Sequence, residues 1–139
     1  MVVLRSEAGL GPALESIALR SPIPVVLQVA TRERFPQPVE AAAYFVASES
    51  LANAAKHSQA SRIDIALRVD DGRLLLLSVR DDGVGGADPG QGSGLVGLRD
   101  RVEALGGSLA IESKLGEGTS LFAVLPIRDE PGARTPAVP

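Results

Sequence analysis

The sequence predicts an α+β fold, a two-layer α/β sandwich in which three helices cover one face of a sheet. Two observations carry this prediction. The elements follow the order helix, strand, helix, two strands, loop, helix, two strands, and the strands after the first form two adjacent hairpins. Hairpins pair antiparallel, and so few helices can cover only one face of the sheet. The length of 139 residues fits one domain with a sizeable core.

The first half of the chain contains two helical patterns separated by a strand. Apolar side chains at helical spacing predict a short helix over residues 9–20, which Pro22 and Pro24 end. A run rich in β-branched residues predicts a strand over residues 25–30. The Ala- and Glu-rich stretch 38–57 is the longest predicted helix, and the prolines at its start cost little because the first helical N–H groups are unpaired anyway.

The second half alternates between strands and turn signals. Clean alternation and the turn Asp70-Asp71-Gly72 predict a hairpin, and a later Gly-rich turn predicts another. The predicted strands are 61–69, 73–79, 108–113 and 119–125, with a helix over 95–105. The loop 81–94 holds six Gly and cannot be regular. We therefore expect one domain over residues 1–127, and a disordered tail over the Pro-rich, polar residues 128–139.

Composition excludes several classes of function. The net charge of -3, from 14 basic and 17 acidic residues, argues against nucleic acid as the main partner. The absence of Cys excludes disulfides and thiolate metal sites. No apolar run approaches the roughly 20 residues that span a bilayer, and the N-terminus lacks a signal-peptide pattern. The expectation is a cytoplasmic domain without direct membrane contact.

The long predicted helix carries the first candidate site. Glu49, Asn53, Lys56 and His57 fall within about a third of the helix circumference. The opposite side is predicted to pack on the sheet through Tyr44, Ala47, Leu51, Ala54 and Ala55. An amide oxygen beside a carboxylate suits magnesium, which keeps several waters and shares them with phosphates, and a nearby Lys can neutralise phosphate charge. An ordinary solvated helix face is an equally good explanation of this pattern taken alone.

The second candidate follows an apolar strand as Asp81-Asp82-Gly83-Val84-Gly85. A carboxylate at a strand end can accept a hydrogen bond from an adenine amino group, whereas guanine would present a carbonyl there and be repelled. Glycine at the next positions lets a ligand approach the backbone. A plain Asp-Gly turn would give the same letters.

The third candidate is Gly92-Ser93-Gly94-Leu95-Val96-Gly97-Leu98, where Gly residues run into a helix start. Free backbone donors and the positive end of the helix dipole form a phosphate cradle there. The letters also match the dinucleotide-binding fingerprint, but that motif should follow a strand in a parallel βαβ unit, and here a loop precedes it. At the start of the last strand, Thr119 has a hydroxyl that can assist at an adenine, or be an ordinary β-branched strand residue.

In combination, these segments resemble the catalytic ATPase domain of sensor histidine kinases, in the superfamily shared with DNA gyrase, the Hsp90 chaperones and mismatch-repair ATPases. The stretch ESLANAAKHS looks like the family's Asn-bearing box, DDGVGG like its first Gly box, GSGLVGLRDRVEALGG like its second, and GEGTSLFAVLP like its closing strand. The resemblance covers residues 10–126 and points to the nitrate-sensor-like subclass. It implies a Bergerat-type fold with a mixed, mainly antiparallel sheet.

The resemblance also implies roles for individual residues. Asn53 would hold magnesium, Glu49 would organise water or act like a base near the γ-phosphate, and Lys56 and His57 would attend the phosphates. Asp81 would read the adenine amino group. The remaining nucleotide-binding residues would be Gly83, Gly85, Gly94, Leu95, Gly97, Leu98 and Thr119. Asp82 occupies the variable position of its box and receives no role.

The implied activity is that of a protein histidine kinase. The domain would bind Mg-ATP and give its γ-phosphate to a histidine on a separate dimerisation domain, serving a response regulator indirectly. The only His in the chain, His57, lies inside the Asn-bearing box, so the acceptor would be elsewhere in a parent protein, whose membrane anchoring stays open. Two alternatives stay open: a stand-alone serine kinase of the anti-sigma-factor type, and a non-catalytic nucleotide-sensing docking module.

Overall fold

The structure is a computed structural model that describes residues 9–84 and 95–127, and the predictions for 1–8 and 128–139 lie outside these residues. Residues 85–94, which include Gly92, Ser93 and Gly94 of the helix-start motif, lie outside them too. The helices are α1 (Leu10–Leu19), α2 (Gln37–Asn53) and α3 (Leu95–Ala104). The strands are β1 (Val25–Val29), β2 (Ile63–Asp70), β3 (Leu74–Asp81), β4 (Ser108–Ser113) and β5 (Thr119–Pro126).

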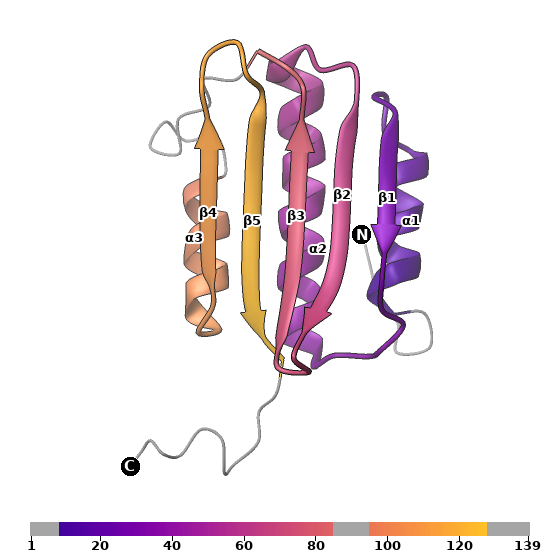
Figure 1. The fold of residues 1–139 in the computed structure, drawn as a ribbon, viewed down its shortest axis with the longest axis vertical. Helices are drawn as coiled ribbons and strands as arrows, with labels where there is room; N and C mark the ends of the chain where they lie inside the picture. Colours follow the sequence, from indigo (N-terminus) through magenta and orange to yellow (C-terminus); the bar gives the residue numbers. More distant parts are fainter. Residues whose placement is uncertain (1–8, 85–94, 128–139) are drawn as a thin grey trace.

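The strands form one mixed sheet in the order β1-β2-β3-β5-β4 (Figure 1). Both predicted hairpins, β2–β3 and β4–β5, are confirmed as antiparallel pairs, and β3 also pairs antiparallel with β5. The edge strand β1 lies parallel to β2. All three helices cover the same face of the sheet (Figure 1), so the predicted fold class is confirmed. Within the described residues, no helix combines the length and apolar character needed to cross a bilayer.

The β2–β3 hairpin illustrates how local sequence sets the register. Asp71 and Gly72 both adopt positive φ, of 59° and 66°, within a three-residue connection, residues 71–73, in which the Arg73 N–H donates to the Asp70 carbonyl at 3.1 Å. The turn aligns Asp70 with Leu74 and carries the pairing to Ile63 opposite Asp81. Since side chains alternate between faces, this register turns alternate apolar residues of both strands toward the helices.

The core lies between the sheet and the helices. The inward side chains of the three central strands are almost fully buried: Ile63, Ile65, Leu67, Leu75, Leu77, Val79, Leu121, Ala123 and Leu125. Ala43 and Ala47 of α2 and Ala54, which directly follows this helix, are equally buried, and these small residues let the helix lie close to the sheet. The predicted packing residue Ala55 is exposed instead. The reason is that α2 ends at Asn53 and continues as a π-helical turn over Ala54–Ser58, whose wider winding rotates Ala55 away from the sheet.

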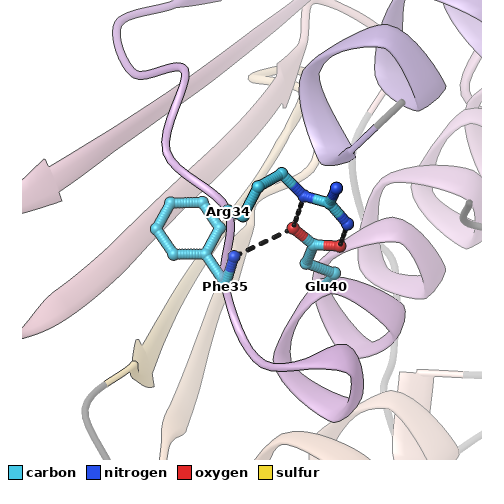
Figure 2. Close-up of polar contacts among 3 residues, drawn as sticks. All are labelled: Arg34, Phe35 and Glu40. Carbon is cyan, nitrogen blue, oxygen red and sulfur yellow. Dashed lines mark hydrogen bonds and ion pairs between the residues drawn. The ribbon is translucent and has the colours of Figure 1, made fainter. Parts of the chain in front are cut away.

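The start of α2 is fixed by a buried carboxylate (Figure 2). Glu40 is fully buried and accepts hydrogen bonds from Arg34 Nε at 3.1 Å, Arg34 Nη2 at 3.0 Å and the Phe35 backbone N–H at 3.0 Å. The Arg34 side chain is 40% exposed, so the pair spans the boundary between solvent and core. Because Glu40 lies in the first turn of α2, its charge also meets the positive end of the helix dipole.

Candidate nucleotide-binding site

The fold brings the described parts of the three sequence motifs to one end of the sheet. β3 ends there at Asp81, α2 ends there at Asn53, and α3 begins there at Leu95 (Figure 1). Thr119 starts β5 directly opposite Asp81 in the ladder. The convergence follows from chain direction. The helix α2 ends at the end of the sheet where β2 begins, and β3 pairs antiparallel with β2 and so returns to that same end.

The Asp81 carboxylate is half-buried and already oriented. Its Oδ1 accepts a hydrogen bond from the Gly83 backbone N–H at 2.9 Å, which closes a local turn at the end of β3. A carboxylate held in this way by one oxygen can present the other to a donor on a ligand. The predicted chemistry of Asp81, accepting a hydrogen bond from an amino group, is therefore compatible with its position.

Two glycines of the β4–β5 turn hold the Asp81 loop from one side. Gly118 has a φ of +77°, and a Cβ on it would lie 2.1 Å from the Asp81 carbonyl oxygen. No other residue fits there without moving the backbone that carries Asp81. The Gly116 N–H donates to the Val84 carbonyl at 2.5 Å, so the β4–β5 turn also holds Val84 in place.

Asp82, to which the sequence assigned no role, holds the same loop from the opposite side. One of its oxygens accepts the backbone N–H groups of Ser61 at 2.8 Å and Arg62 at 3.1 Å, and the other accepts the Ser61 hydroxyl at 2.5 Å. These partners lie just before β2. The available signal was the hairpin register: a three-residue connection at 71–73 aligns residue 63 with 81, which places 82 beside 61 and 62.

The hydrogen bonds to Asp82, above all the one from the Ser61 hydroxyl, lower its pKa from the ordinary 3.8. A pKa lower in the folded than in the unfolded chain means that the charged form stabilises the fold. That contribution is present above pH 3.8 and is lost as the pH falls through the lowered pKa. We therefore expect Asp82→Asn to be less stable than wild type near neutral pH, with the difference narrowing in acid.

Urea unfolding at a series of pH values between about 7 and about 3 measures this narrowing. The matched control is Asp70→Asn, at the exposed last residue of β2 at the other end of the sheet. Its effect should stay within about 0.5 kcal/mol at every pH. A stability difference for Asp82→Asn that is constant with pH would contradict the prediction.

A second polar residue at this end was also missed. The hydroxyls of Thr119 and Ser113 lie 2.7 Å apart and form a hydrogen bond. In register, Asp81, Thr119 and Ser113 form a row across β3, β5 and β4. Ile63 of β2 pairs with Asp81 and so shares its face of the sheet. Because Ile63 is in the core, this row points to the helix side of the sheet. The sequence signal for the Ser113–Thr119 pair was the predicted hairpin, because the residues that flank its short turn must lie opposite each other.

The α2 residues of the motif are divided by the π-helical turn. Glu49 and Asn53 lie one turn apart in the regular helix and are both half-buried. Lys56 lies in the π-helical turn and is exposed. The backbone of His57 belongs to the same turn, and its side chain lies outside what the structure describes. The predicted regular spacing of all four therefore holds only for Glu49 and Asn53.

The oxygen donors fit a cation that is shared with a ligand. Across residues 9–84 and 95–127, no group of three His, Asp or Glu side chains could hold a metal ion. A cation bound through the Asn53 amide would take its other ligands from phosphates and water, which is how magnesium is commonly held beside a nucleotide.

The start of α3 gives a mixed result for the predicted cradle. Gly97 is exposed, and a Cβ there would meet nothing within 4 Å, so internal packing does not require glycine. Leu98 is 4% exposed and belongs to the core, so it can serve the site only by holding α3 in place. The side chain of Leu95 lies outside the description, as do Gly85 and Gly94.

A cavity of about 340 Å³ lies elsewhere, between the start of α1 and the residues around Arg34. Its lining includes Val29 at the end of β1, toward the opposite end of the sheet from Asp81. None of the motif residues lines it. The candidate site is therefore assigned from the convergence of motifs and not from this cavity.

A model of the family described as histidine kinase-, DNA gyrase B-, and HSP90-like ATPase matches residues 39–129. The chain belongs to this ATPase family. The match runs from the first turn of α2 past the end of β5, so it spans all three motifs and Thr119. The family assignment and the histidine kinase relatives make the chain an ATP-binding catalytic domain of the histidine kinase type.

Two curated relatives of this chain are histidine kinases. The oxygen sensor histidine kinase NreB of Staphylococcus carnosus is 35% identical over 101 residues, which cover 70% of this ATPase domain and 29% of NreB. The signal transduction histidine-protein kinase/phosphatase DegS of Brevibacillus brevis is also 35% identical over 101 residues, covering 70% and 26%. The similarity to NreB is consistent with the predicted subclass. The chain spans less than a third of either relative.

Solved structures agree on the architecture. The histidine kinase domain from the blue-light activated histidine kinase of Erythrobacter litoralis EL346 is 26% identical, with a TM-score of 0.65, covering 85% of this chain and 59% of that one. The mycobacterial sensor histidine kinase MprB has a TM-score of 0.64 over 86% of this chain and 92% of its own. At 24% identity the second comparison supports the fold alone.

Proposed function

We propose that this ATPase domain binds Mg-ATP across the end of the sheet where α2 and β3 finish, and donates the γ-phosphate to a histidine on a separate dimerisation domain. One observation carries the proposal: the end of the helix bearing Asn53 and the strand end bearing Asp81 lie at the same end of one molecule. In a member of this ATPase family, this convergence supports Asp81 as an acceptor for the base and Asn53 as an oxygen ligand for the cation.

In this proposal the adenine end is served by the row on the sheet. Asp81 accepts a hydrogen bond from the adenine amino group, and Thr119 contributes its hydroxyl beside it. Gly83 and Gly85 give the base access to the backbone. Gly94, Leu95, Gly97 and Leu98 form the loop and helix start over the phosphates, where N–H groups and the helix dipole favour anionic oxygens.

The phosphate end is served by α2 and its π-helical turn. Asn53 holds magnesium, which supplies charge neutralisation at the phosphates when bound. Glu49 organises water or acts like a base near the γ-phosphate, and Lys56 and His57 attend the phosphate oxygens. Phosphoryl transfer asks little covalent chemistry of a protein, so the residues act by positioning and by charge neutralisation.

The parent protein, in this proposal, is a two-component sensor kinase with its catalytic domain in the cytoplasm. Its dimerisation domain carries the acceptor histidine, and a response regulator receives the phosphoryl group from that histidine. The similarity to histidine kinases of which the matched residues make up less than a third supports this arrangement.

Phosphoryl transfer to the dimerisation domain of the parent kinase tests the proposal. With γ-labelled ATP and magnesium, the wild-type domain should label that partner with the acid-labile, alkali-stable phosphate expected of phosphohistidine. Chelating magnesium should abolish labelling, and Asn53→Ala should slow it by roughly 10- to 100-fold. Gln37→Ala, an exposed amide at the other end of α2, is the matched control and should leave the rate unchanged.

Other outcomes would count against a histidine kinase. Acid-stable phosphate on an anti-sigma antagonist, with no labelling of the dimerisation domain, would indicate a serine kinase. Binding of Mg-ATP without transfer to either partner would indicate a nucleotide-sensing module. A domain that binds no nucleotide at all would overturn the whole proposal.

A further inference from the structure

We propose that Asp82 is a positioning residue of the nucleotide site, whose carboxylate sets the distance between the α2 end that carries Asn53 and the strand end that carries Asp81. This inference rests on the proposed function, since it concerns a ligand that spans both ends. It assigns a purpose to the second Asp of the DDG sequence, which touches neither the base nor the phosphates in the proposed site.

The first step is that the contacts of Asp82 are more extensive than an exposed side chain needs. Three donors from two successive residues, Ser61 and Arg62, converge on its two oxygens. Asp82 is exposed, so these bonds are not forced by the need to satisfy a buried charge. A carboxylate held by three donors is fixed in one rotamer, and it fixes the backbone of its partners in turn.

The second step is where those partners lie. Ser61 and Arg62 come between the π-helical turn that ends the α2 segment and the first residue of β2. In this stretch Gln59 has a left-handed φ of 55°, and residues 59–62 belong to neither a helix nor a strand. Anchoring Ser61 and Arg62 therefore anchors the irregular segment that leads back to Lys56 and Asn53.

The third step is that the Asp81 loop is held differently on its two sides. Toward β5, backbone contacts from Gly116 and Gly118 hold it, and no side-chain change at Asp82 removes them. Toward the α2 segment, the carboxylate of Asp82 makes the connection. Loss of this carboxylate should leave the base-reading geometry of Asp81 in place, while the segment 59–62 and the exposed side of the π-helical turn before it lose one of the contacts that hold them.

This asymmetry predicts a selective defect. A ligand that uses both ends, Mg-ATP, should bind more weakly, because small displacements of one contacting group are costly in a site built for a fixed separation. A ligand that uses the base end alone, adenosine, should bind as before. A residue with a merely structural role would weaken both ligands together or neither, so the ratio of the two affinities is the informative quantity.

The test measures Kd for Mg-ATP and for adenosine by competition with a fluorescent adenine nucleotide, using wild type, Asp82→Ala and Asp82→Asn. We expect Asp82→Ala to raise the Kd for Mg-ATP about tenfold and to change that for adenosine less than about twofold. Asp82→Asn should stay within about threefold of wild type for both. Its amide oxygen can accept both N–H groups, and its NH₂ can donate to the Ser61 hydroxyl.

Glu40→Gln serves as the stability control, because it perturbs the buried pair near the other end of α2 and should leave the affinity ratio unchanged. If Asp82→Ala does not fold, Ser61→Ala removes only the hydroxyl donor and should show the same selectivity, with a two- to threefold loss for Mg-ATP.

Wild-type affinity for Mg-ATP in Asp82→Ala would overturn the inference, as would equal losses for Mg-ATP and adenosine. A wild-type domain that fails to bind Mg-ATP would instead overturn the proposed function, so the two failures are distinguishable.

Discussion

Replacing Asp81 with Asn is expected to raise the Kd for Mg-ATP by roughly 10- to 100-fold, the loss associated with a hydrogen bond to a charged group. The substitution keeps the local turn, since the Asn oxygen can accept the Gly83 N–H that Asp81 accepts at 2.9 Å. That orientation leaves the Asn NH₂ facing the site. In wild type the Asp81 carboxylate accepts from the adenine amino group, whereas in the variant the side-chain NH₂ faces that amino group and both are donors.

The same reasoning predicts a change in base preference. An NH₂ group at position 81 can donate to the carbonyl oxygen of guanine, which the Asp81 carboxylate repels. Titrating ATP and GTP against wild type and Asp81→Asn by calorimetry measures both effects, and the preference for ATP should shrink in the variant. Asp70→Asn, at the exposed last residue of β2 at the far end of the sheet, is the matched control. Equal ATP affinity of wild type and Asp81→Asn would remove Asp81 from the site.

Replacing Arg34 with Ala is expected to lower the free energy of unfolding by about 3 kcal/mol. The Glu40 carboxylate is fully buried, and without Arg34 it keeps only the Phe35 N–H among the contacts in Figure 2. An uncompensated buried charge is far more costly than a lost surface contact. The value lies at the lower end for buried pairs because the Arg34 side chain is 40% exposed, so that water already screens part of the attraction.

Chemical denaturation of Arg34→Ala and Arg62→Ala gives the comparison. Arg62 pairs with Asp64 at a similar distance, 2.9 Å, but these side chains are 59% and 46% exposed, so its loss should cost less than about 1 kcal/mol. The Arg62 backbone N–H that meets Asp82 survives this substitution. Equal losses for the two variants would show that burial of Glu40 does not decide the cost.

Local sequence predicted the described elements well because each depends on nearby residues. The turn at Asp71 and Gly72 needs positive φ at two adjacent positions, and Asp-Gly is among the few pairs that accept it. The alternation in β2 determined which side chains would be buried, and Ile63, Ile65 and Leu67 are all in the core. Where local rules failed, as at Ala55, the cause was a π-helical turn that apolar periodicity does not signal.

The placement of the site is predicted by sequence only in part. The chemistry of Asp81, Asn53 and Thr119 could be named from residue type and motif order, and the fold brings all three segments to one end. The roles given to them, and to the residues outside the described ranges, stay predictions. Asp82 and Ser113 were missed because their roles depend on hydrogen bonds to residues that only strand pairing brings close to them.

The sequence by itself determined the residues of the helices and strands, the two hairpins and the three motifs. Tertiary structure alone decided that β3 pairs with β5 and β1 with β2, that Glu40 is buried against Arg34, and that Asp82 joins the Asp81 loop to the segment after α2. The physical reason is range. Polarity patterns and turn residues act over a few positions, whereas strand order and a carboxylate's donors depend on how the whole chain packs.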